Sequence, residues 1–200
     1  FSDGDFTNNP SWLGQTTLFQ VNAGELQLSD PAPGSSNSSS LVVTAPTTSQ
    51  APTVWEFLVK LTFSPSASNY ASVYLNASKT DLSQDLDGYF VKIGGISGSD
   101  DALELFRQDG NSTTSLISGT VGAVGGSQPI ARIRVIRTEV GVWTLAADYT
   151  GGTDFQTEGT ATDATYPSGQ YFGFQCNYTS TRSNNFFFDD VSIDPIFEDV

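Results

Sequence analysis

The sequence predicts an all-β fold, a two-sheet antiparallel β-sandwich of the jelly-roll type, from three observations. Stretches that alternate apolar and polar residues recur roughly every 8–15 residues, as the strands of a sandwich do. Gly, Ser and Asn turns separate these stretches, and no helical periodicity extends beyond one turn. A chain of 200 residues can form one sizeable core, so we expect a single domain over residues 1–200.

The clearest predicted strand covers residues 54–63. Its apolar residues, including Trp55, occupy alternate positions, and Glu56 and Lys60 fall between them. Short turns predict three hairpins, formed by residues 19–21 with 25–28, 102–107 with 114–117, and 130–137 with 141–149. The remaining predicted strands are 41–44, 70–77, 89–93, 169–178 and 185–193, and we expect surface loops at 29–40 and 45–52.

Charge and residue usage exclude several classes of function. Twenty-two Asp and Glu residues against eight Lys and Arg give a net charge of −14, and this negative field opposes binding to nucleic acid or to an anionic membrane. The absence of His excludes Ser-His-Asp and Cys-His catalysis. Cys176 alternates with phenylalanines and is expected to be a buried apolar residue. The acidic, Ser/Thr/Asn-rich composition is typical of exported proteins and predicts a secreted or cell-surface location without membrane insertion.

Two pairs of carboxylates lie near opposite ends of the chain. Asp3 and Asp5 flank a glycine near the start, and Asp189 and Asp190 follow an aromatic run in the last predicted strand. If the two ends meet, the four carboxylates converge. Hard oxygen ligands suit calcium, so the sequence predicts a structural calcium site at the chain ends.

Alternation along the last strand supports this interpretation. It places Asp189 on the same face as the apolar residues Phe187, Val191 and Ile193, where a carboxylate needs a cation or hydrogen-bond donors. The alternative is that Asp189 and Asp190 cap the edge of the sheet through backbone N–H groups.

A second group of candidate residues lies on the polar faces of three predicted strands. Sugar recognition needs aromatic rings that stack on the C–H side of a pyranose and polar groups that bond its hydroxyls. By alternation, the suitable residues that point away from the core are Tyr70, Tyr74, Asn76, Arg132, Arg134, Tyr171, Gln175 and Asn177. The two arginines would suit an anionic glycan. The alternative is a solvated sheet on which Arg132 and Arg134 pair with cross-strand acids such as Glu104.

Segments 88–94, 103–110, 133–137, 141–145 and 186–193, the last reading Phe-Phe-Phe-Asp-Asp-Val-Ser-Ile, resemble the concanavalin A-like lectin/glucanase jelly roll. The resemblance is strongest to modules of secreted, multimodular proteins of Bacteroidetes. The chain ends are also similar to those of calcium-binding carbohydrate-binding modules, which pair an acidic, glycine-containing segment with an Asp-Asp-Val-Ser strand. The resemblance implies glycan binding on a concave sheet and neighbouring domains in a larger protein.

Glycosidases of this fold carry paired acids along one strand, as in Glu-x-Asp-x-x-Glu, so that two carboxyl groups flank the scissile bond. No such arrangement occurs here, because Glu104 stands alone in its strand and Glu139 and Glu158 lie in predicted turns. We therefore expect a noncatalytic carbohydrate-binding module that binds a polysaccharide. The alternatives are a structural or adhesive module that contacts other proteins, and an atypical glycoside hydrolase or polysaccharide lyase.

Overall fold

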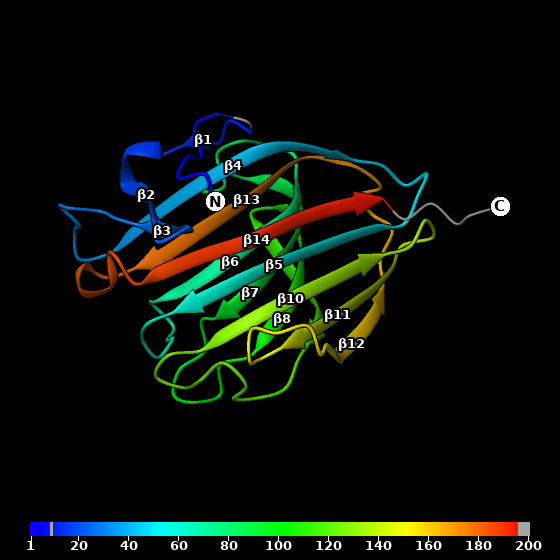
Figure 1. Cartoon of the computed structure of the whole chain (residues 1–200). Helices are drawn as coiled ribbons and strands as arrows, with labels where there is room; N and C mark the ends of the chain where they lie inside the picture. Colours follow the sequence, from blue (N-terminus) through cyan, green and yellow to red (C-terminus); the bar gives the residue numbers. More distant parts are fainter. Residues whose placement is uncertain (9, 196–200) are drawn as a thin grey trace.

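The computed structural model describes residues 1–8 and 10–195, which form two antiparallel sheets stacked face to face (Figure 1). In spatial order, sheet A contains β1 (Leu13–Gly14), β4 (Asn37–Thr47), β13 (Gly169–Tyr178), β6 (Tyr70–Ala77), β7 (Leu86–Gly94), β8 (Leu103–Gly110) and β9 (Ser112–Ser118). Sheet B contains β12 (Gln156–Thr162), β11 (Val142–Asp148), β10 (Ile130–Arg137), β5 (Thr53–Leu61), β14 (Phe186–Pro195), β3 (Glu25–Leu28) and β2 (Phe19–Asn22). The predicted two-sheet β-sandwich is confirmed.

Sequential and distant strands are mixed in both sheets, as in a jelly roll. The three predicted hairpins are present as β2–β3, β8–β9 and β10–β11. The last two strands are inserted between early ones, since β13 lies between β4 and β6, and β14 lies between β5 and β3. The described residues contain two short 3₁₀ turns, Thr16–Leu18 and Ser180–Arg182, and no helix long and apolar enough to cross a membrane.

The core between the sheets is built largely from aromatic rings. Trp55 and Trp143 of sheet B stack with ring centroids 5.7 Å apart. Phe174 of sheet A stacks on Phe188 of sheet B at 4.2 Å and on Trp12 of the N-terminal segment at 5.2 Å. All five side chains are buried. The inward side of β13 therefore ties both β14 and the N-terminal segment to sheet A.

Alternation predicted the core and most strands correctly. Trp55 and Cys176 are fully buried, and burial raises the pKa of the Cys176 thiol well above its ordinary value. The two largest parts of the sheets that were missed are β12 and the ends of β4. The sequence of β12 contains no large apolar residue, and β4 begins at Asn37, inside the segment predicted to be a loop. Both gain their hydrogen bonds from a neighbouring strand, β11 or β13, so tertiary pairing overrides weak local preference.

A β-bulge in β14 reverses the facing of the second half of the strand. In a regular strand, residues five positions apart point to opposite faces. Phe188 and Ile193 are five positions apart, yet they lie opposite Val59 and Trp55 of β5, which both face inward. Asp190, within the bulge, has a φ of 50°, in the left-handed region. The prediction that Asp189 shares a face with Val191 and Ile193 is wrong, because the extra residue turns the later part of the strand over.

Replacement of the central aromatic residue, Phe174→Ala, is expected to lower the free energy of unfolding by about 3–5 kcal/mol. The lost ring leaves a cavity between Trp12 and Phe188 that the rigid sheets cannot close. Urea unfolding followed by far-ultraviolet circular dichroism measures the change. The control, Val140→Ala, removes methyl groups from a residue that is 72% exposed and should change stability by less than about 0.5 kcal/mol. Equal losses in the two variants would contradict this account of the core.

Candidate functional site

The outer face of sheet A gathers five of the eight predicted carbohydrate-binding residues. The strand register places Tyr70 of β6 opposite Asn177 of β13, and Gln175 follows two positions along β13 on the same face. Tyr74 and Tyr171 continue this face and pack into one small apolar cluster outside the main core. The sequence therefore predicted the facing of these five residues correctly.

A groove with a volume of about 330 Å³ lies on this face. Three aromatic rings stack in a row across its strands, Tyr74 on Phe90 with centroids 5.0 Å apart and Phe90 on Phe106 with centroids 5.2 Å apart. We call it the sheet A groove. Its lining is Tyr70, Tyr74 and Gln175 together with Ser72, Phe90, Lys92, Phe106, Gln108 and Thr113.

Six lining residues of the sheet A groove were not among the predicted binding residues, and four of them lie on β7 and β8: Phe90, Lys92, Phe106 and Gln108. The sequence pattern does indicate their facing, because alternation within β7 and β8 places all four on the face that points away from the core. A phenylalanine in an alternating strand normally indicates a core position, so a second aromatic face is easily overlooked. Only the cross-strand register shows that these rings form a row with Tyr74.

Hydrogen bonds fix the polar groups of the sheet A groove. The Tyr74 hydroxyl donates to Oε1 of Gln108 at 2.9 Å, and Nε2 of Gln108 donates to the carbonyl of Gly110 at 2.8 Å. Nε2 of Gln175 donates to the carbonyl of Leu82 at 3.1 Å. Tyr74 is buried, whereas Tyr70 is partly exposed and has Lys92 Nζ 4.7 Å from its ring centroid. Burial raises the pKa of both phenols, so they are uncharged hydrogen-bonding groups at neutral pH.

Asn76 does not lie on this face, contrary to the prediction. A bulge in β6 places an extra residue opposite β13, since Tyr74 pairs with Gly173 but Ala77 pairs with Tyr171. Asn76 is 1% exposed, and its Oδ1 accepts a hydrogen bond from the backbone N–H of Tyr89 at 2.9 Å. Its role is to hold neighbouring backbone in place.

Arg132 and Arg134 lie on the other side of the molecule, on β10 in sheet B. Both pair with Glu56 of β5: Nη2 of Arg134 lies 2.9 Å from Oε2, and Nη1 of Arg132 lies 3.7 Å from Oε1. Arg132 also donates to Oδ2 of Asp190 at 2.5 Å. The expectation that Arg132 and Arg134 share one binding surface with the tyrosines is wrong. The arginines do pair with cross-strand acids, but not with Glu104, which belongs to sheet A.

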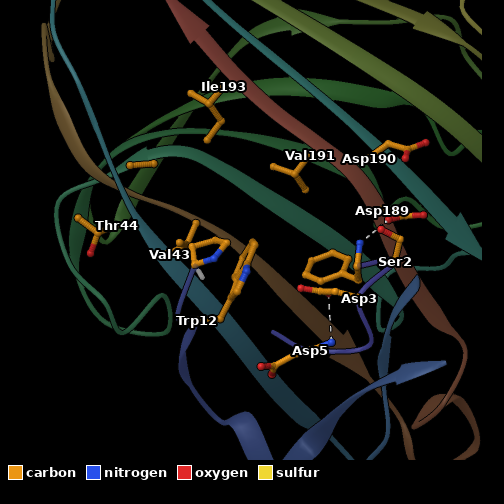
Figure 2. A pocket seen from close by; sticks show the side chains of 13 residues that line it. Ser2, Asp3, Asp5, Trp12, Val43, Thr44, Asp189, Asp190, Val191 and Ile193 are labelled. Atoms are coloured by element: carbon orange, nitrogen blue, oxygen red, sulfur yellow. Dashed lines mark hydrogen bonds and ion pairs between the residues drawn. The ribbon is translucent and has the colours of Figure 1, made fainter. Parts of the chain in front are cut away.

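The N-terminal segment lies against β14, so the two pairs of carboxylates converge as predicted, beside a pocket of about 530 Å³ (Figure 2). Asp3, Asp5, Asp189 and Asp190 all line this pocket. The amino group of Phe1 lies 3.2 Å from Oδ1 of Asp189. Figure 2 shows side chains of the N-terminal segment, β4 and β14 around this pocket.

The four carboxylates in this pocket are not arranged as a set of metal ligands. Thr7 and Asn8 donate to the two oxygens of Asp5, and Arg132 donates to Asp190. The bond from the backbone N–H of Thr7, with further side-chain bonds, lowers the pKa of Asp5 to about 2. Over residues 1–8 and 10–195, no three acidic side chains come together closely enough to hold a metal ion. In this arrangement each of the four carboxylates already has a protein partner, so they do not form a preformed calcium site.

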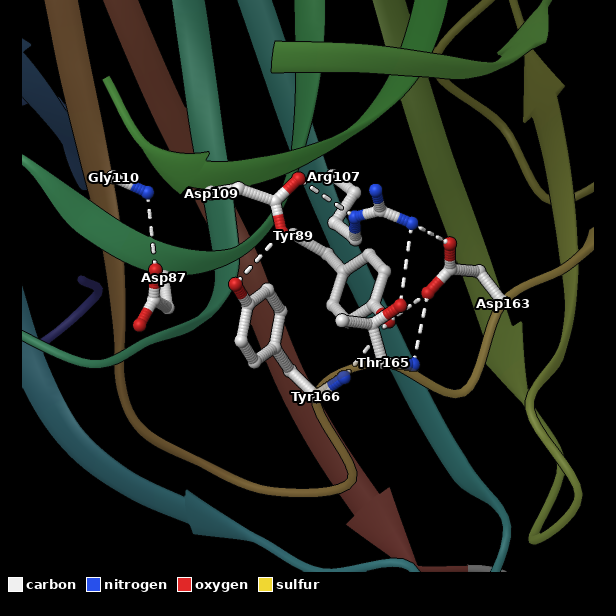
Figure 3. Close-up of polar contacts among 8 residues, drawn as sticks. All are labelled: Asp87, Tyr89, Arg107, Asp109, Gly110, Asp163, Thr165 and Tyr166. Carbon is white, nitrogen blue, oxygen red and sulfur yellow. Dashed lines mark hydrogen bonds and ion pairs between the residues drawn. The ribbon is translucent and has the colours of Figure 1, made fainter. Parts of the chain in front are cut away.

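A polar network around Arg107 joins sheet A to the loop that follows β12 (Figure 3). Arg107 pairs with Asp109 at 2.9 Å and with Asp163. Hydroxyl groups complete it, since Tyr89 donates to Asp163 at 2.5 Å and Tyr166 donates to Asp109 at 2.7 Å. This cluster of carboxylates beside tyrosines is an arrangement in which a catalytic acid could be sought.

The pKa values of this cluster do not match those of a glycosidase. A hydrogen bond from Tyr166, followed by one from Arg107, lowers the pKa of Asp109. Burial alone would raise the pKa of Asp163, but hydrogen bonds from Tyr89, Thr165 and Arg107 outweigh it and lower the pKa. A catalytic acid needs a raised pKa, so these carboxylates act as ionised partners of Arg107.

Replacement of the buried partner, Asp163→Asn, is expected to lower the free energy of unfolding at pH 6 by about 1–3 kcal/mol. Because the pKa of Asp163 is lowered in the folded protein, its contribution is fully present above the unfolded value near pH 4. That contribution is lost as the pH falls through the lower folded value. Urea unfolding should therefore show a larger difference from the parent protein at pH 6 than at pH 2.5.

The matched control is Asp85→Asn, which removes an ion pair with Lys79 whose side chains are 60% and 51% exposed. Its effect should be small at both pH values, because exposed pairs contribute little. An equal loss for Asp163→Asn at pH 6 and pH 2.5 would assign the effect to packing and contradict the role of charge.

Solved structures with the same architecture are lectin-like and carbohydrate-binding domains. A legume lectin-like domain from Entamoeba histolytica has a TM-score of 0.66 and 12% identity, over 96% of this chain and 92% of that one. The exoplasmic/lumenal domain of VIP36, solved in a Ca²⁺/Man2-bound form, has a TM-score of 0.69 and 12% identity, over 95% and 82%. The carbohydrate-binding module CBM66 from Bacillus subtilis has a TM-score of 0.60 and 13% identity, over 92% and 96%.

At these identities the likeness is one of fold, and it confirms the concanavalin A-like jelly roll that the sequence resembles. No protein-family model matches the chain, and neither does any curated protein sequence. The chain covers most of the length of each of these three domains.

Proposed function

We propose that this chain is a noncatalytic carbohydrate-binding domain and that it holds a glycan in the sheet A groove. The observation that carries the proposal is the lining of that groove, in which a row of aromatic rings borders amide, hydroxyl and ammonium groups. This combination matches the two faces of a pyranose, one apolar and one hydroxylated. The fold shared with lectin-like domains supports the same assignment.

Some residues of the groove are accessible to a ligand, and others support its shape. Tyr70 and Phe106 are partly exposed and lie on the strands that flank β7, so their rings are available to stack on a sugar. Lys92 on β7 and Thr113 on β9 offer donors to sugar hydroxyls. Gln108 uses its amide in an internal hydrogen bond and keeps the floor of the groove in shape.

A polysaccharide is the proposed ligand, because an open groove on a sheet accepts the inner residues of a chain. For an anionic polysaccharide, Lys92 is the basic residue of the groove lining that would pair with a sugar carboxylate. Arg132 and Arg134 do not support that specificity, since both pair with acids on sheet B. We propose a secreted or cell-surface location within a larger, multidomain protein, in line with the exoplasmic or lumenal origin of the VIP36 domain.

The variant Tyr70→Ala is expected to weaken glycan binding about tenfold, because it removes the accessible stacking surface; this corresponds to about 1.4 kcal/mol. A glycan array that includes neutral and uronate polysaccharides would identify a ligand, and isothermal titration would then measure the change. Arg134→Ala, on the opposite face, is the control and should bind as the parent protein does. If no glycan binds, or if Arg134→Ala and Tyr70→Ala weaken binding equally, the assignment to the sheet A groove is wrong.

Calcium at the chain ends stays a prediction of the sequence, to be tested on the pocket in Figure 2. A calcium ion bound only by the folded protein would stabilise it by about 2.7 kcal/mol at a calcium concentration of one hundred times Kd. The melting temperature would therefore rise with the calcium concentration. The variant Asp189→Asn would abolish that rise if Asp189 is a ligand. Melting curves in calcium chloride and in EDTA make the comparison, and identical curves would contradict a calcium site.

A further inference from the structure

Two strand edges face the chain-end pocket without a partner among the described residues. β3 pairs with β14 only at Phe187 and Phe188, so from Asp189 onward β14 pairs with β5 alone. β1 pairs with β4 only at Leu41 and Val42, so the later part of β4 pairs with β13 alone. The backbone N–H and C=O groups on the outer side of both strands are therefore open within residues 1–8 and 10–195.

The space between these edges is an apolar groove, which we call the edge groove. Val191 and Ile193 project from β14 toward Val43 of β4, and Trp12 closes the floor (Figure 2). Ile193 also lines a second hollow of about 380 Å³ beside Pro195, so the edge groove follows β14 to the end of its described part. Both hollows lie against the main core, because Val191 and Ile193 pack on it.

The rim of the edge groove is acidic. Asp3 and Asp190 are exposed at the rim, and Asp5 and Asp189 stand beside them. Asp190 pairs with Arg132 and Asp189 lies beside the Phe1 amino group, so among the described residues Asp3 and Asp5 are the rim carboxylates that have no basic partner. Among the described residues that line the two hollows, none is Lys or Arg. The groove thus joins an apolar floor to negative charge in a protein whose net charge is −14.

We propose that the edge groove binds an extended segment of a partner protein with alternating apolar and basic residues, which adds as a strand to β14. The open edge supplies backbone hydrogen bonds, and side chains at every second position would fill the space above Trp12, Val191 and Ile193. The basic side chains between them would meet Asp3 and Asp5. The β4 edge is less suitable because Pro46 has no N–H to donate, whereas β14 has no proline between Asp189 and Asp194.

The acidic rim selects this occupant over a second copy of the chain. A second copy would bring the same four carboxylates against each other, and like charges in contact oppose association. A basic segment has the complementary charge, and it is attracted by the field of the whole molecule. This site is separate from the sheet A groove, so the two proposals can fail independently.

The probe is the fluorescently labelled peptide Lys-Val-Lys-Val-Lys-Val-Lys, blocked at both ends, with fluorescence anisotropy as the measure of binding. The parent protein should bind it at least tenfold more tightly than the matched peptide with Glu in place of Lys, and several-fold more tightly than a peptide with the same residues in blocks. Hydrogen exchange of the backbone over 189–195 should slow in the complex, because strand addition covers that edge. Unchanged exchange over 189–195, or equal binding of the alternating and block peptides, would overturn the proposal.

The double variant Val191→Thr and Ile193→Thr should weaken peptide binding about tenfold, since it places hydroxyls in the apolar floor. The matched control is Val121→Thr with Val140→Thr, two residues that are each 72% exposed elsewhere on the surface, and it should leave binding unchanged. Equal effects of the two double variants would overturn the proposal, as would a dimer in sedimentation velocity that the first variant abolishes. The peptide comparisons on the parent protein remain decisive if the variant is unstable.

Discussion

The stacking of Phe174 on Phe188 and Trp12 determines where both candidate surfaces lie. Phe174 faces the core from β13, and the next residue, Gln175, faces outward into the sheet A groove. The position of the groove is therefore fixed by the core contact directly behind it. Phe188 immediately precedes Asp189, where β14 begins to line the edge groove. The same contact therefore also fixes the position of this part of β14.

Alternation predicted the facing of Tyr70, Tyr74, Tyr171, Gln175 and Asn177, because the side-chain period of a strand is a local property of the backbone. It could not place Arg132 and Arg134, because local pattern does not say which sheet a strand joins. Asn76 and the residues after Asp189 were misplaced for a related reason. A bulge adds one residue relative to a partner strand, and that partner is distant in sequence. Polar strands such as β12 were missed because their stability comes from pairing.

Five of the eight basic residues already pair with carboxylates within the molecule. Arg107, Arg132 and Arg134 all contact carboxylates, and so do Lys60 and Lys79. These contacts neutralise charge locally and join neighbouring strands or loops. The acids that remain outnumber them, so the surface presents mainly carboxylates to any approaching partner. A ligand that is itself anionic must therefore gain its affinity at short range, from a local contact such as Lys92.

The hydrogen bonds from Tyr74 to Gln108 and from Gln175 to Leu82 have a thermodynamic consequence. Ordering a flexible side chain on binding costs about 0.5–1.5 kcal/mol, and these side chains have already been ordered by folding. A glycan bound there, as proposed, would meet a floor that folding has already shaped. Differences in affinity among ligands would then reflect how well each one matches that shape, and the entropy of the protein would change little between them.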